Sequence, residues 1–409
     1  MPTKFGLVLT GGGARAAYQA GVIKGVTEIL GAKVPSALPS TLPAAVAEVN
    51  PEKPPNHSKL IEPPFSILAG ISAGAINTAF LASKAADFYG ATQDLCKLWN
   101  ELEIDLVLDT DFSTLGKIGA RWLRDLSLGG VFGCSGANHL LETTPLKKFL
   151  EGYINFKEIK NNIHSKLIRG VALSVTNYKT GTAISYFDGH PSIEPWLRSS
   201  RIGLRTDLVL EHVLASASIP LLFAPVAIGH SFFGDGGIRM TSPLSPAIHL
   251  GADRILAIGI RYARPDSYVL EINQSQEMHS VTLADISGVL LNAAFLDTLE
   301  SDIERMERIN QTLALMPEEL KKKHPQKLRS IPVLAIRPSQ DLGTLASEQF
   351  HLFPRMLRFL LKGIGASDRQ GWDLLSYLAF DKTYTGCLLD LGYHDAYQMK
   401  DQILEFFLG

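Results

Sequence analysis

The stretch "LAGISAGAIN", Leu68 to Asn77, places one serine between two glycines in an apolar neighbourhood. The residues from Phe65 to Ala69 form a short apolar run that predicts a buried strand, and from Ala73 the apolar residues recur at helical spacing. Ser72 is therefore expected at a junction between a strand and a helix. Such a junction decides the fold, because an α/β sheet is built from units of this kind.

The pentapeptide Gly70-Ile71-Ser72-Ala73-Gly74 has the G-x-S-x-G form of a nucleophile elbow. Gly70 and Gly74 suit a sharp turn, because a side chain at either position would collide with nearby backbone. The turn lifts the serine hydroxyl clear of the sheet, and the N-terminus of the next helix faces the developing anion. Ser72 is thus a candidate nucleophile, and the alternative is a tight turn whose serine caps the helix.

A second unit of the same kind opens the chain. The apolar run "FGLVLT", Phe5 to Thr10, ends in Gly11, Gly12 and Gly13 and leads into a stretch of helical spacing. Further buried strands are predicted at Arg254 to Ile260 and Ile331 to Pro338, and a hairpin at Arg169 to Phe187. Strands that alternate with helices predict an α/β fold whose mostly parallel sheet is covered by helices on both faces.

The three glycines allow two interpretations. Gly11, Gly13 and Ala16 fit a variant of the dinucleotide-binding fingerprint, but the chain then enters a proline-rich stretch where the acidic residue of such a site belongs. An oxyanion hole suits the glycines better, since backbone N–H groups without side chains can approach a carbonyl oxygen closely. Arg15 could add positive charge to this loop or brace it.

Asp235 is the candidate base for Ser72. A serine hydroxyl needs a base to become a good nucleophile, and Asp235-Gly236-Gly237 follows a predicted strand with a turn that can present the carboxylate. His230 and His249 flank this segment and are more simply explained as structural residues. The alternative is an ordinary Asp-Gly turn without chemistry.

Composition narrows the class of protein. With 409 residues, of which 46% are hydrophobic, the chain can bury one large core plus an appendage, and a net charge of −2 provides no basic field for nucleic acid. Three well-separated cysteines offer no zinc or redox pair, so neither a metal nor a cofactor is expected.

The N-terminal apolar run is too short for a signal peptide, which predicts a cytoplasmic protein. The apolar stretch 281–299 carries two aspartates, so membrane contact would be peripheral.

Taken in order, the Gly11 to Arg15 loop, the Ser72 elbow and Asp235-Gly236-Gly237 resemble the patatin-like phospholipase family, in its bacterial cytosolic type. The segments "ASASIPLLFAPV" (Ala215 to Val226) and "SPLSPAIHLGADRILAI" extend the resemblance. It implies a three-layer α/β/α sandwich and a Ser72–Asp235 dyad without histidine, with an oxyanion hole at Gly11, Gly12, Gly13 and Arg15. A lipid substrate at a membrane or micelle surface is implied as well.

The expected organisation is a catalytic domain at 1–264, interrupted by a proline-rich insertion at 35–64, and a mainly helical region at 265–409 packed on it. The insertion could serve as a lid or a partner surface, and the helical region as a wall of the cleft, a lid or the interface of a homo-oligomer. The expected function is a serine acyl hydrolase of lipid esters. The alternative is a catalytically silent protein of the same fold that binds acyl lipids.

Overall fold

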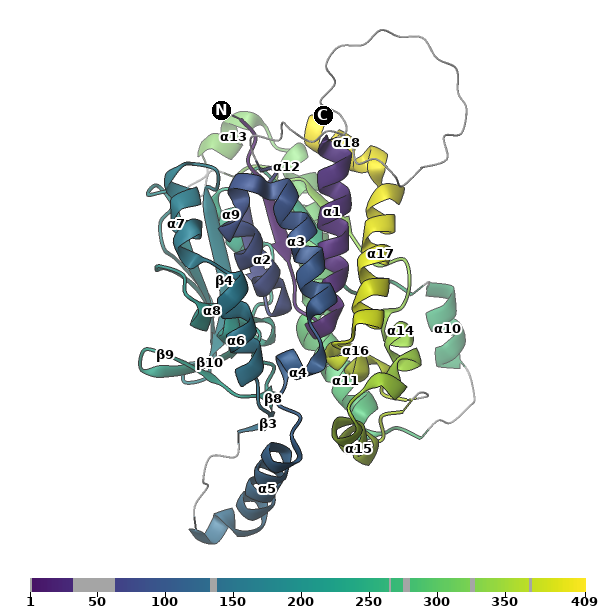
Figure 1. Cartoon of the computed structure of the whole chain (residues 1–409). Coiled ribbons are helices and arrows are strands. Elements are labelled where there is room, and N and C mark those ends of the chain that lie inside the picture. The colour runs from purple at the N-terminus through teal and green to yellow at the C-terminus, as the bar shows by residue number, and fades with distance from the viewer. Residues whose placement is uncertain are drawn as a thin grey trace.

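The computed structural model describes residues 2–31, 63–132, 138–264, 266–274, 280–323, 328–367 and 370–409 (Figure 1). The proline-rich insertion predicted at 35–64 lies outside the described residues, apart from its last two positions. Among the described residues, one ten-stranded sheet forms the centre of the molecule.

The parallel part of this sheet contains the strands that the sequence predicts most clearly. In spatial order they are β12 (Val333–Ile336), β11 (Arg254–Ile258), β1 (Phe5–Leu9), β2 (Ile67–Ile71) and β4 (Gly170–Asn177), and each neighbouring pair is parallel. Their carboxyl ends consequently lie at one edge of the sheet. The predicted mostly parallel α/β sheet is confirmed.

Beyond β4 the sheet becomes mixed. The predicted hairpin is present, with β5 (Thr182–Gly189) antiparallel to β4, followed by β7 (Arg201–Arg205) and β6 (Trp196–Arg198) at the outer edge. A further hairpin of β9 (Val226–Ile228) and β10 (Ser231–Asp235) joins the end of β4 in antiparallel fashion. A small separate sheet pairs β3 (His139–Leu141) with β8 (Leu221–Phe223).

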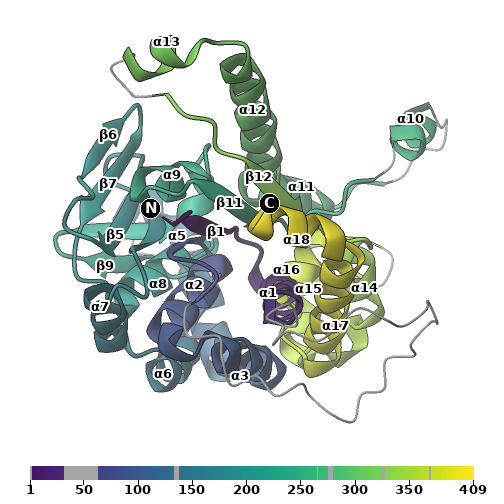
Figure 2. The same ribbon diagram turned by 90° about the horizontal axis from the view of Figure 1, so that it is seen from above.

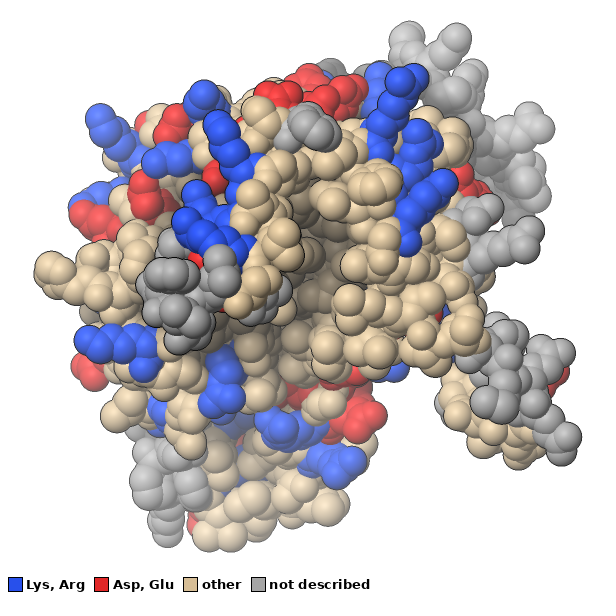
Figure 3. Space-filling model, turned by 90° about the horizontal axis from the view of Figure 1, so that it is seen from below, with Lys and Arg blue, Asp and Glu red and all other residues tan. Residues whose placement is uncertain are grey.

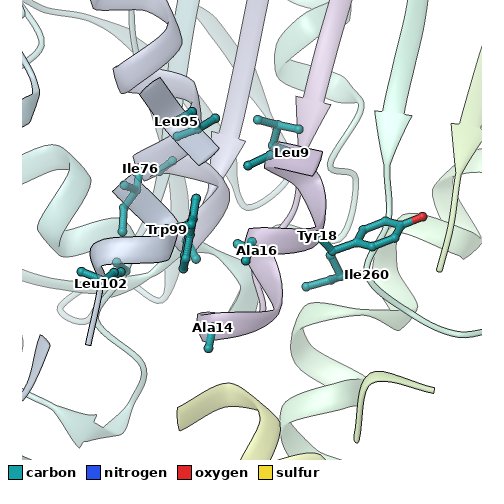
Figure 4. Close-up of a cluster of buried hydrophobic side chains, with 14 of the residues drawn as sticks. Leu9, Ala14, Ala16, Tyr18, Ile76, Leu95, Trp99, Leu102 and Ile260 are labelled. Atoms are coloured by element: carbon teal, nitrogen blue, oxygen red, sulfur yellow. The ribbon is translucent and has the colours of Figure 1, made fainter. Parts of the chain in front are cut away.

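Helices cover both faces of the sheet, as Figure 2 shows from above. Alternate residues of β1 explain the layers: Leu7 and Leu9 point into one core and Val8 into another. The first core lies under α1 (Ala17–Gly31), α2 (Ala73–Ser83) and α3 (Phe88–Glu101), whose packing around Trp99 is drawn in Figure 4. The second lies under α9 (Ser245–Leu250) and α12 (Asp297–Ala314). The molecule is therefore a three-layer α/β/α sandwich.

The region after residue 265 is mainly helical, as predicted. Its helices besides α12 are α10 (Asp266–Gln274), α11 (Leu283–Phe295), α13 (Glu318–Lys323), α14 (Leu342–Glu348), α15 (Arg355–Gly363), α16 (Trp372–Leu378), α17 (Lys382–Gln398) and α18 (Lys400–Leu408). This region also supplies β12, and α17 runs along α1, where the Tyr18 hydroxyl donates to Asp395 Oδ2 at 2.9 Å. The division of the chain at residue 264 stays a prediction.

Other helices connect the strands of the first part of the chain: α4 (Ile104–Val107), α5 (Phe112–Phe132), α6 (Thr144–Tyr153), α7 (Phe156–His164) and α8 (Leu210–Ser216). Within the described ranges, no helix combines the length and the apolar character needed to cross a bilayer.

Candidate active site

Ser72 occupies the sharp turn between β2 and α2. Its backbone angles are φ 58° and ψ −132°, a conformation that is strained for any residue with a side chain. A Cβ on Gly70 would lie 2.4 Å from Thr78 Oγ1, and a Cβ on Gly74 would lie 2.3 Å from the Leu9 carbonyl oxygen. Both glycines are thus sterically required. The Ser72 side chain makes no capping hydrogen bond to α2, which argues against the helix-cap interpretation.

The strained turn is held by two serines that the sequence patterns did not single out. The Ser72 N–H donates to Ser216 Oγ at 2.8 Å, and the Ser216 hydroxyl donates to the Ser174 carbonyl oxygen at 2.6 Å. Ser216 is fully buried at the end of α8. This chain ties the turn to β4, the neighbouring strand.

The register of β4 brings Asp235 to the same place. Ile71 of β2 pairs with Ser174, and the next residue of β4, Val175, pairs with Asp235 of β10. The Asp235 N–H donates to the Ser218 carbonyl oxygen at 2.9 Å, and its own carbonyl accepts from Thr176 Oγ1 at 2.7 Å. The predicted nucleophile and base, 163 positions apart in the chain, meet because three strands align.

The Asp235 carboxylate is fully buried and only half satisfied. Its Oδ1 accepts the Gly237 N–H at 2.9 Å, while Oδ2 has no hydrogen-bond partner within the described residues. Burial raises the pKa of Asp235 to about 7, and the neighbouring Ser72 hydroxyl and the Gly237 N–H lower it only in part. The Ser72 hydroxyl is thus beside the carboxylate without forming a hydrogen bond of ordinary geometry in this state. A carboxylate with a free oxygen and a pKa near neutrality is suited to accept a proton.

The glycine loop after β1 packs directly against the elbow. A Cβ on Gly11 would lie 2.3 Å from the Ser72 Cβ, so only glycine allows the two loops to approach this closely. Gly13 has a φ of 58°, and a Cβ there would lie 2.2 Å from the Tyr377 carbonyl oxygen. Gly12 is packed against Ile260 in the same way. The loop can therefore present backbone N–H groups close to Ser72, the geometry that an oxyanion hole requires.

Arg15 is a brace in this structure. Its Nη2 donates to Asp373 Oδ1 at 2.7 Å and its Nε to Ser376 Oγ at 2.7 Å, and its guanidinium lies over the Tyr377 ring. Burial tends to raise the pKa of Asp373, but the Arg15 charge and the Asn292 amide outweigh burial and lower it. Arg15 itself is almost fully buried. Every partner belongs to α11 or α16, so the side chain fastens the glycine loop to the helical region.

Ser72 opens onto a narrow apolar pocket. Its lining includes Gly13, Ser72 and Ala73 together with large apolar side chains from several elements, namely Ile76, Trp99, Leu102, Val107, Leu146, Ile219, Phe223 and Phe380. The cavity has a volume of about 20 Å³, enough for one water molecule and far too small for an acyl chain. The lining is apolar, as an acyl chain requires, but the pocket is closed in this state.

Phe380 is shared by this closed pocket and a groove at the surface. Phe380 lines the Ser72 pocket and also a larger surface groove of about 220 Å³, whose other apolar residues include Ile104, Leu352, Phe353 and Pro354. The Phe380 side chain is 7% exposed. Since nothing in the motifs points to residue 380, the sequence offered no signal for it.

The histidines that the structure describes lie apart from the Ser72 pocket lining. No histidine lines the pocket at Ser72. His249 stacks on Trp196 with ring centroids 4.6 Å apart, and burial lowers its pKa to about 4. His230 is exposed on the turn before β10. In the described part of the chain, no group of three or more histidine, cysteine or acidic side chains is placed to hold a metal ion.

A family model described as patatin-like phospholipase matches residues 7–248, which is more than half of the chain and includes Ser72 and Asp235. The chain belongs to the patatin-like phospholipase family. Membership in this family supports hydrolysis of acyl lipids as the general activity. The matched range ends before α10, so the helices that brace Arg15 lie outside it, as does Phe380 in the connection between α16 and α17.

Among solved structures, that of VipD from Legionella pneumophila is similar to this chain. The similarity covers 98% of this chain and 67% of that chain, with 12% sequence identity and a TM-score of 0.33. A comparison with curated proteins found no match.

Proposed function

We propose that this patatin-like protein is a serine acyl hydrolase that cleaves fatty-acyl esters of lipids and phospholipids. Ser72 is the nucleophile and Asp235 the base. The observation that carries the proposal is the buried Asp235 carboxylate, which has one unpartnered oxygen and interacts with the hydroxyl of a strained serine at a strand-to-helix turn. No other described serine combines these features, and the adjacent apolar pocket suits an acyl chain.

The reaction follows from these positions. The Ser72 hydroxyl gives its proton to Asp235 as its oxygen bonds to the ester carbonyl carbon, and the resulting oxyanion is stabilised by N–H groups of the Gly11 to Gly13 loop. When the ester C–O bond breaks, Asp235 returns the proton to the departing alcohol. Water then attacks the acyl-enzyme, with Asp235 again taking the proton. Free fatty acid leaves and Ser72 regains its proton.

The test is labelling and turnover in the same preparation. We expect a fluorophosphonate probe to label the parent protein at Ser72, and a p-nitrophenyl acyl ester to be hydrolysed. Ser72→Ala should abolish labelling and lower kcat about 10⁴-fold, whereas Ser301→Ala, an exposed serine on α12, should change neither. Folded parent protein that neither reacts with the probe nor turns over ester would instead support the silent acyl-binding alternative.

The pH profile gives an independent test. Only the ionised carboxylate can accept the serine proton, so kcat/KM should rise with pH and level off above an apparent pKa near the value of about 7 for Asp235. A kcat/KM that stays constant from about two pH units below that pKa to about two units above it would exclude Asp235 as the base.

A further inference from the structure

The exposed face of α15 combines apolar and basic side chains next to the surface groove that contains Phe380. At 100° per residue, Leu357 and Leu361 face the core, and Phe359 lies at the centre of the opposite face. Phe359 is 69% exposed, and Leu360 beside it is 41% exposed. A phenylalanine that projects from a surface helix to this degree is costly in water and indicates a binding partner.

Cations border the same face. Arg355 and Lys362 flank Phe359 on one side of the helix, and Arg358 follows next to the core. None of the three forms an ion pair within the described ranges, although Glu348 lines the same hollow as Arg358 and Lys362. Arg358 Nη1 donates instead to the His351 carbonyl oxygen at 2.8 Å. The charges are therefore available to an anionic partner.

The apolar surface continues from α15 onto the start of α11, which lies next to it in space. The Ala284 N–H at the start of α11 donates to the Ile364 carbonyl oxygen, directly after α15, at 3.0 Å. At this junction Val281 is 72% exposed and Leu283 is 59% exposed. Figure 3 views this end of the molecule and shows a broad uncharged area around a hollow, with Lys and Arg along part of its border and a cluster of Asp and Glu below it. We call Arg355, Phe359, Leu360 and Lys362, with Val281 and Leu283, the docking surface.

The docking surface adjoins the route to Ser72. Leu352, Phe353 and Pro354, the residues immediately before α15, line the surface groove that shares Phe380 with the Ser72 pocket. A partner seated on α15 would therefore lie at the mouth of this groove. Apolar side chains surrounded by cations match one partner in particular, a bilayer whose acyl layer takes up Phe359 and whose anionic headgroups meet Arg355 and Lys362.

We propose that α15 docks this protein on anionic phospholipid surfaces, with the groove beside Pro354 facing the membrane. The proposal rests on the proposed function, because it names where that site meets its substrate. Binding itself does not require turnover, so Ser72→Ala protein should bind vesicles as the parent does. Parent protein that binds vesicles but hydrolyses no ester would thus contradict the proposed function and leave docking standing.

The experiment is co-sedimentation of the full chain with vesicles of phosphatidylcholine alone or mixed with phosphatidylglycerol. We expect strong binding only to the anionic vesicles, weakened by added salt. Phe359→Ser should weaken it about tenfold or more, and Lys362→Glu about fivefold or more. Leu315→Ser and Lys400→Glu are matched controls, because Leu315 is exposed directly after α12 and Lys400 is exposed on α18. Both substitutions should leave binding unchanged.

Hydrolysis of a water-soluble short-chain ester checks that each variant is folded and should stay at the parent value. Equal binding to neutral vesicles, or unchanged binding of Phe359→Ser and Lys362→Glu, would overturn the proposal. A second outcome would also overturn it: the parent protein does not bind vesicles but forms a dimer, and Phe359→Ser dissociates this dimer. The docking surface would then be a contact between two copies. Lys362→Arg, which keeps the positive charge, should bind vesicles as the parent does, whereas Lys362→Gln, which removes it, should bind more weakly.

Discussion

The elbow at Ser72 and the helices around Arg15 are both essential parts of the candidate site, yet they are encoded in different ways. The elbow is local: two glycines and a serine within five residues set the backbone conformation. The bracing of Arg15 is distant, because Asp373 and Ser376 lie more than 350 positions further along the chain. In the proposed reaction, local motifs thus carry the chemistry, and the helical region supports the glycine loop.

The largest expected effect tests the local side of this comparison. Asp235→Asn should lower kcat about 10³-fold, because the amide cannot accept the serine proton. The fold should survive, since Asn can still accept the Gly237 N–H. Circular dichroism alongside the kinetics separates the two effects. Severe misfolding of Asp235→Asn would show that the carboxylate is structural.

The same variant makes a prediction for stability. The pKa of Asp235 is raised from 3.8 to about 7 on folding. As pH rises between these values, the unfolded chain releases its proton before the folded one, so the parent loses stability over this range. Asp235→Asn should therefore match the parent at pH 4 and exceed it by up to about 4 kcal/mol at pH 8. Thermal unfolding at both pH values measures this difference, and a constant gap would contradict it.

Arg15→Met tests the bracing of the glycine loop by residues far along the chain. It leaves Asp373 and Ser376 without their partner and should destabilise the protein by about 3 kcal/mol, with activity falling in proportion to the unfolded fraction. Arg15→Lys keeps the charge but not the forked contacts, and should lie in between. Denaturant unfolding provides the values. Should Arg15→Met remain fully stable but lose kcat, Arg15 would belong to the oxyanion hole and the two regions would share the chemistry.

A smaller effect is expected at the boundary between the pocket and the surface groove. Phe380→Leu should raise kcat/KM for a long-chain ester by about three- to tenfold, because a smaller side chain increases the fraction of open molecules. Hydrolysis of an acetyl ester should hardly change, since a short acyl group needs little of the pocket. An equal gain on both substrates would exclude a selective gate at Phe380.

The smallest effect is expected at His249. His249→Asn should leave kcat unchanged and cost only the stacking on Trp196, which contributes about 1 kcal/mol. Steady-state kinetics with the same ester suffices. A loss comparable to that of Ser72→Ala would restore a triad and contradict the dyad.

The sequence predicted what local patterns determine. The buried strands β1, β2, β11 and β12 are continuous apolar runs between clear breaks, and the hairpin of β4 and β5 has an evident turn. The edge strands β6 and β7 were not predicted, because they are short and half exposed and so lack a clear alternation. The glycine-rich stretch "LGGVFGCSGAN" at 128–138 predicts a break in the helical pattern, but the described helix α5 continues through Gly129 and Gly130.

Of the site, the sequence indicated the residues whose type is unusual at their position. Ser72, Asp235 and the glycines belong to this class. It did not indicate Ser216 or Phe380, nor the buried amide of Asn77, which accepts from Trp99 Nε1 at 2.7 Å and donates to Gln19 Oε1 at 3.0 Å. A buried serine or phenylalanine resembles any other until tertiary structure assigns its partner, so these contacts required the fold.

The hydrogen bond from the Ser72 N–H to Ser216 Oγ determines which backbone amides can stabilise the oxyanion in the proposed reaction. A backbone amide that is already committed to a hydroxyl is not free to receive negative charge from a substrate. The nucleophile can therefore attack but cannot also stabilise the product of its own attack. That duty passes to a loop more than fifty positions earlier in the chain, so neither loop is competent without the other.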